Sequence, residues 1–140
     1  MEYVMLIYNA EERWNALTEA EEARIMAGHM AVIEKSQADG TFRAGNRLMD
    51  VAAATTVRNH DGKITVTDGP FAETKEQLGG YYVFEADDLD TVTGYASLLP
   101  HGDVGCVEIR PIFRTRNERL RRSAQGGPSS GGRSAAPILG

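Results

Sequence analysis

The chain has 140 residues, of which 41% are apolar and 25% charged, with a formal net charge of −5. That length fits a single domain with a genuine core. Residues 114–140 hold six arginines and one glutamate and so carry +5, which leaves −10 on residues 1–113. An acidic body repels a nucleic-acid backbone, so nucleic-acid binding is not expected, except weakly through the basic tail.

Cys106 is the only cysteine, which excludes a disulfide or a cysteine metal cage within the chain and fits a reducing compartment. No secretory signal or membrane-spanning run is visible, so we expect a cytoplasmic protein with no membrane partner. His29, His60 and His101 are far apart and have no ligand spacing around them. Gly79-Gly80 is not followed by Lys-Ser or by a helix. The sequence therefore predicts no metal and no cofactor.

The first elements in the chain are a strand and a long helix. Residues 3–8, YVMLIY, are apolar at every position, which predicts a strand buried on both faces. A short polar stretch follows, and then Thr18 and Glu21 have the spacing of a capping box that opens a helix. Gly40 is a plausible helix stop. The expected apolar stripe of this helix consists of Met26, Met30 and Ile33.

The remaining elements are mostly strands. Residues 41–49 are expected to form one strand, and residues 54–59 and 63–67 a hairpin around Asp61-Gly62, a dipeptide typical of such turns. After a loop over residues 68–79 come three further elements. These are a strand over 80–86 that is again apolar on both faces, a helix capped by Asp87-Asp88 and ending near Pro100, and a last strand over 104–113.

The resulting order is β-α-β, an inserted hairpin and β-α-β, which predicts an α+β, ferredoxin-like, split β-α-β fold over residues 1–113. The strands over residues 2–9 and 80–86 should be neighbours in the centre of the sheet. Two helices cover only one face of a four-stranded sheet, so we expect a homodimer to cover the other. Residues 114–140 are basic and then rich in Gly, Ser and Pro, and are expected to be disordered.

A long run after the hairpin, TDGPFAETKEQLGGYYVFEADDLD, carries a specific resemblance. Together with the opening YVMLIY and the closing VEIRP, it resembles the DGPF branch of the YCII-related family. That resemblance implies a dimeric α+β barrel built from two ferredoxin-like units. It also implies a frequent association with genes for extracytoplasmic-function sigma factors, and hence a regulatory or stress context.

The DGPF loop is the first candidate site. Asp68, Glu73, Lys75 and Glu76 place four ionisable groups within nine residues, on a loop next to a central strand. The alternative is a plain surface turn, because Asp-Gly-Pro forms turns readily. The candidate residues for binding a small polar ligand are Phe71, Glu73, Lys75, Tyr82 and Arg110.

His29 is the second candidate. It falls at the edge of the expected helical stripe, where an isolated histidine is usually a core or boundary residue. The resemblance to the wider YCII group implies a catalytic histidine on this helix, paired with an aspartate. That aspartate is absent here, because Leu99 stands before Pro100. Asp68 is the candidate replacement, with Glu73 second.

The last strand offers a third candidate, since Cys106, Glu108 and Arg110 alternate onto one face. Either Glu108 and Arg110 pair with each other or at a dimer interface, or Arg110 lines a pocket and holds an anion.

Two functions remain open on this basis. The first is a ligand-binding or regulatory protein, and the second is a lyase or dehydrohalogenase-like enzyme in which His29 is the base and Asp68 orients it. The incomplete dyad favours the first.

Overall fold

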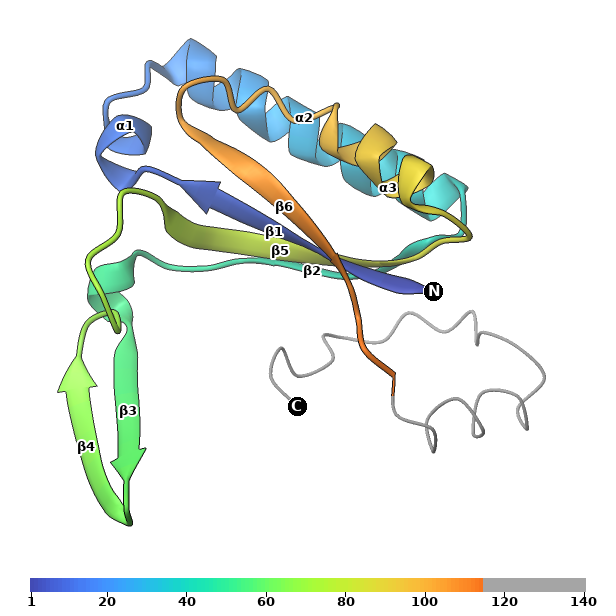
Figure 1. Cartoon of the computed structure of the whole chain (residues 1–140). Coiled ribbons are helices and arrows are strands. Elements are labelled where there is room, and N and C mark those ends of the chain that lie inside the picture. The colour runs from blue at the N-terminus through green and yellow to red at the C-terminus, as the bar shows by residue number, and fades with distance from the viewer. Residues whose placement is uncertain (115–140) are drawn as a thin grey trace.

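The computed structural model describes residues 1–114 and builds them around a four-stranded sheet with helices on one face (Figure 1). Arg114 apart, the predicted tail lies outside the described residues. The elements in chain order are β1 (Glu2–Asn9), α1 (Glu11–Asn15), α2 (Glu19–Ala38), β2 (Phe42–Arg47), the 3-10 helix η1 (Val51–Ala53), β3 (Thr55–His60), β4 (Lys63–Asp68), β5 (Gln77–Glu85), α3 (Leu89–Ala96) and β6 (Gly105–Pro111).

The sheet has the order β2-β5-β1-β6, and every neighbouring pair is antiparallel. The two strands that are apolar on both faces, β1 and β5, lie side by side in its centre, as predicted. This arrangement, with α2 and α3 as the crossovers, is the ferredoxin-like α+β fold expected from the sequence. The short helix α1 was not predicted.

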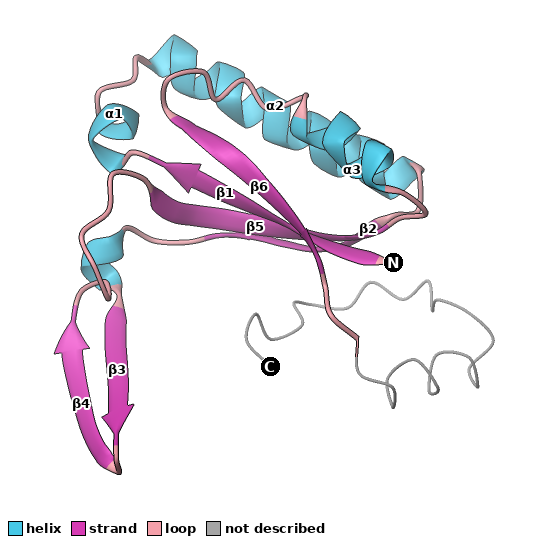
Figure 2. Ribbon diagram, viewed as in Figure 1, coloured by secondary structure: helices cyan, strands magenta, loops and turns pink. Residues whose placement is uncertain are grey.

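The core lies between the sheet and its two helices (Figure 2). Alternate residues of β1 point into it, and Met5 is completely buried against Phe84 of β5 and Val32 of α2. The residues between them, Val4 and Leu6, face the opposite side of the sheet and are only half-buried. No helix within residues 1–114 covers that second side (Figure 2).

Helix α2 begins as predicted but is rotated relative to the expected stripe. The Thr18 side chain accepts the Glu21 N–H, and the Glu21 carboxylate accepts the Thr18 N–H, which completes the capping box. The core-facing residues, however, are Ile25, Gly28, Val32 and Ser36. Met26 and Met30 are 39% and 53% exposed.

Gly28 explains this rotation. A Cβ atom at this position would lie 2.6 Å from the carbonyl oxygen of Leu98, in the segment that follows α3. The helix therefore presents a glycine where the chain crosses it closely, and its larger side chains are displaced to the flank. Small residues at a contact point do not show in a hydrophobic pattern, which is why the expected stripe was wrong at Met26 and Met30. Ile33, its third member, does pack against the core.

The hairpin β3–β4 forms a separate two-stranded sheet that extends away from the main one (Figure 1). Asp61 and Gly62 form its turn with φ values of 50° and 82°, as the Asp-Gly signal predicted. No helix within residues 1–114 is both long and apolar enough to cross a membrane.

Candidate functional site

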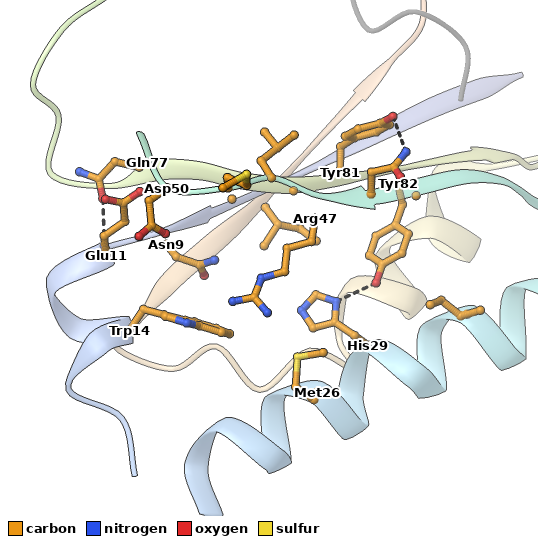
Figure 3. Close-up of a pocket in the computed structure, with 18 of the residues that line it drawn as sticks. Asn9, Glu11, Trp14, Met26, His29, Arg47, Asp50, Gln77, Tyr81 and Tyr82 are labelled. Carbon is orange, nitrogen blue, oxygen red and sulfur yellow. Dashed lines mark hydrogen bonds between the residues drawn. The ribbon is translucent and has the colours of Figure 1, made fainter. Parts of the chain in front are cut away.

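A cavity of about 250 Å³ opens at one end of the sheet, between α2 and the strands β2 and β5 (Figure 3). The short helix α1 and the turn after β2 complete its rim. Its apolar lining includes Ile7, Trp14, Met26, Met30, Ile33 and Phe42. Its polar lining includes Asn9, Glu11, His29, Arg47, Asp50, Gln77 and Tyr82.

His29 and Tyr82 form a hydrogen-bonded pair in the wall of the cavity. The Tyr82 hydroxyl lies 2.7 Å from Nδ1 of His29, and the two rings are stacked with centroids 5.9 Å apart. Either the phenol donates to Nδ1, or Nδ1–H donates to the phenol oxygen and leaves a lone pair on Nε2. Gly45 makes room for this contact, because a Cβ atom there would lie 2.6 Å from the Tyr82 ring.

Both members of this pair are neutral near pH 7. Burial, together with the smaller electrostatic effects of His101 and Arg47, lowers the pKa of His29 to about 4. Burial also raises the pKa of Tyr82 to about 12. A neutral imidazole at pH 7 can bind a polar group or accept a proton, although a pKa this low makes it a weak base.

A second histidine, His101, lies edge-on to His29 with ring centroids 5.6 Å apart. His101 is buried, and its Nδ1 lies 3.1 Å from the side-chain oxygen of Asn9, to which it can donate. Burial lowers the pKa of His101 as well. No sequence pattern indicated this proximity, because the two residues are 72 positions apart, His29 on α2 and His101 in the loop before β6. Residues 1–114 contain no cluster of three side chains able to hold a metal ion.

Arg47, at the end of β2, was also missed by sequence reasoning. Its guanidinium carbon lies 5.3 Å from the centre of the Trp14 ring, within cation–π distance. Figure 3 shows the side chain extending into the space between Trp14 and His29. Trp14 lies on α1, which was not predicted because residues 11–15 show no clear hydrophobic periodicity. The sequence therefore did not indicate that Trp14 would contact Arg47.

Glu11 connects three elements at the rim of the cavity through hydrogen bonds. Its carboxylate accepts the Val51 N–H at 2.8 Å, and its own backbone N–H donates to the Gln77 side chain at 2.9 Å. One residue thereby joins α1, η1 and the start of β5. Asp50 lines the same rim and is exposed.

The DGPF loop is not brought to this cavity. Asp68 ends β4 and is exposed, and neither it nor Phe71, Glu73 or Lys75 lines the cavity wall. The expected pairing of His29 with Asp68 is therefore not made within this chain, and Nδ1 of His29 meets Tyr82 instead. The reason is topological: β3 and β4 pair only with each other, so the loop follows the projecting hairpin.

The loop itself has the geometry of a structured turn. Gly69 has a φ of 98°, its N–H donates to the Ala54 carbonyl, and its own carbonyl accepts the Thr56 hydroxyl. Phe71 is 71% exposed. Of the predicted ligand-binding residues, only Tyr82 lines the cavity. The part of the run TDGPFAETKEQLGGYYVFEADDLD that does reach the cavity is its middle, the first half of β5, where Gln77, Gly79, Gly80, Tyr81 and Tyr82 line the wall.

Arg110 lies on the opposite face of the sheet. Its Nε donates to the Glu108 carboxylate at 2.8 Å, and Arg110 does not line the cavity. Of the two alternatives for Arg110, the structure therefore shows the pair with Glu108 and not an anion site in a pocket. This hydrogen bond also holds the pKa of Glu108 below its usual value. The neighbouring Cys106 thiol donates to Glu76 at 3.2 Å, which raises the pKa of that thiol.

Comparisons with known proteins support the family that the sequence resembles. An uncharacterized protein of Rhizobium meliloti (strain 1021) is 38% identical over 114 residues, which cover 80% of this chain and 92% of that protein. A dehydrochlorinase of 5-chloro-2-hydroxyhydroquinone from Burkholderia phenoliruptrix AC1100, solved with 2,5-dihydroxybenzoquinone, is 14% identical. The match covers 84% of this chain and 99% of that one, with a TM-score of 0.45. The model of the YCII-related domain matches residues 1–116. The chain belongs to the YCII-related family.

Proposed function

We propose that this protein binds a small organic molecule in the cavity between α2, β2 and β5, and that His29 and Tyr82 contact the ligand. The observation that carries this proposal is the combination, in one concave space, of an apolar wall with a neutral histidine, a phenol and an arginine. Small-molecule sites are typically apolar clefts with a few convergent polar groups. The volume of about 250 Å³ is below the range of roughly 300–1,000 Å³ for drug-sized ligands, which favours a smaller molecule.

The biological setting is proposed from the sequence. Membership of the DGPF branch, a cytoplasmic location and a role in a sigma-factor-linked response all rest on the resemblance and the composition. We further propose a homodimer, closed into an α+β barrel through the sheet face that carries Val4 and Leu6. Half-buried apolar residues on a face without helices support this arrangement.

Native mass spectrometry of the purified protein tests the binding proposal, because it detects a co-purifying small molecule directly. Met30→Trp fills the rim of the cavity, and Glu34→Trp is the matched control on the exposed face of the same helix. We expect the bound species to be lost in the first variant and kept in the second. A ligand that survives Met30→Trp unchanged would place the binding site elsewhere.

Proton transfer on the ligand is the second candidate function. Its specific support is that the imidazole of His29 is neutral and is held by Tyr82, which fixes the direction of the ring. The carboxylate of Asp68 has no part in this version. The test is to incubate the bound molecule with protein in deuterium oxide and follow the loss of a carbon-bound proton by NMR. Exchange that His29→Gln abolishes supports catalysis, and exchange that is absent from the wild type leaves binding alone.

A further inference from the structure

Arg47 is exposed at the end of β2, and its side chain extends into the cavity between Trp14 and His29 (Figure 3). Among residues 1–114, no hydrogen bond and no carboxylate within 4.0 Å satisfies its N–H groups, and its contact is the Trp14 ring. We propose that the cavity ligand is a small organic monocarboxylate with an apolar body, and that Arg47 anchors its carboxylate. This inference rests on the proposed binding function and names the class of ligand.

The geometry suits a planar anion. The guanidinium carbon of Arg47 lies 5.3 Å from the centre of the Trp14 ring. A guanidinium is a planar group that offers its N–H donors as a fork. A carboxylate matches that fork with two parallel hydrogen bonds, each strengthened by charge. Among residues 1–114, Arg47 is also the only lysine or arginine side chain that lines the cavity. A ligand anion therefore has a single cationic partner in this wall.

The other titratable groups around the cavity restrict where an anion can sit. His29 and Tyr82 are neutral and can donate or accept a hydrogen bond without repelling it. Glu11 and Asp50 are at the rim beside η1, and one oxygen of Glu11 is held by the Val51 N–H. Their negative charges disfavour an anion at the rim, so the carboxylate belongs on the side of Arg47 that faces His29.

The rest of the cavity requires an apolar body. Beyond the polar groups, the wall includes Met26, Met30, Ile33 and Phe42, and methionine side chains adapt to flat or irregular ligands. Inorganic phosphate is a poor fit, because a second negative charge would be desolvated against this wall without a second cation. The cavity volume of about 250 Å³ is below the range for drug-sized ligands, so this apolar body must be small.

Trp14 is the single tryptophan of the chain and lies against Arg47, so its fluorescence reports on the site directly. The probes are benzoate, its neutral isostere benzamide, and inorganic phosphate. The variants are Arg47→Gln and the control Arg24→Gln, an exposed arginine on α2 that does not line the cavity. We expect benzoate to change the Trp14 emission at a saturable concentration, and phosphate to leave it unchanged. Arg47→Gln should weaken benzoate roughly tenfold or more, with Arg24→Gln near wild type.

The outcomes separate this inference from the function on which it rests. Equal binding of benzamide and benzoate, with no effect of Arg47→Gln, overturns the carboxylate anchor but leaves a cavity that binds neutral molecules. If phosphate binds and benzoate does not, the proposal that the ligand is an organic monocarboxylate is also overturned. If no probe changes the emission and native mass spectrometry finds no bound molecule, both the inference and the binding function fail.

Discussion

The hydroxyl of Tyr82 lies 2.7 Å from Nδ1 of His29, and this hydrogen bond joins the central strand β5 to the middle of α2. From the sequence we predict a carboxylate of the DGPF loop, Asp68, as the hydrogen-bond partner of His29, but the structure has Tyr82 in that position. The consequence for chemistry is large, because a neutral phenol does not stabilise a charged imidazole as a carboxylate does. Burial without a carboxylate partner keeps His29 neutral, which suits the binding of a ligand more than strong base catalysis.

Replacing Tyr82 with Phe should destabilise the protein. The change removes the hydroxyl but keeps the ring, and it leaves Nδ1 of a partly buried histidine without a partner. We expect a loss of about 1–3 kcal/mol in the free energy of unfolding, measured by urea denaturation. Tyr8→Phe is the control, because its hydroxyl meets Glu108 on the other face of the sheet at the longer distance of 3.4 Å. Equal losses in the two variants would argue that the His29 contact has no special weight.

Stability should fall as the pH is lowered through the region between about 6.5 and 4. The pKa of His29 is lowered from 6.5 to about 4 in the folded state, so the unfolded chain binds more protons over this range and unfolding is favoured by acid. His101 acts in the same direction. Allowing for the partial exposure of His29, its share is about 1–2 kcal/mol.

Urea denaturation at a series of pH values measures this dependence. His29→Gln should flatten the curve between these limits, whereas His60→Gln, on the exposed tip of the hairpin, should leave its slope unchanged. A wild-type curve that is already flat from pH 6.5 to 4 is incompatible with a buried neutral His29.

Asp68→Asn should have little effect on the cavity. The residue is exposed at the base of the hairpin and does not line the wall, so we expect a change of roughly 0.5 kcal/mol or less in stability. Binding of a cavity ligand, followed by Trp14 fluorescence, should be the same as in the wild type. A marked loss of binding would instead show that Asp68 reaches a cavity in the assembled protein, for example that of a second copy.

The proposed dimer predicts a concentration-dependent mass in sedimentation. Leu6 lies opposite Glu108 and Tyr81 in the sheet register, on the face without helices. Leu6→Asp places a charge in the proposed interface and should shift the protein to the monomer. Ala23→Asp, on an exposed position of α2, is the matched control. A wild-type chain that stays monomeric at micromolar concentration contradicts the dimer.

The sequence alone determined the features that depend on neighbouring residues. The capping box of Thr18 and Glu21 and the turn at Asp61-Gly62 are satisfied within a few residues, so their signals could be recognised directly. The two-sided apolar strands predicted the centre of the sheet, because only central strands need both faces buried. Order along the chain then gave the ferredoxin-like fold.

The tertiary structure alone decided the site. The hydrogen bond between His29 and Tyr82 joins residues 53 positions apart, and the cation–π contact between Arg47 and Trp14 joins residues 33 positions apart. Both depend on strand register, and the first also depends on the rotation of α2. That rotation depends on Gly28, where the backbone of a crossing segment approaches too closely for a side chain. Hydrophobic periodicity records the size and polarity of side chains but not such a contact, so the sequence could indicate His29 as a candidate without identifying its partner.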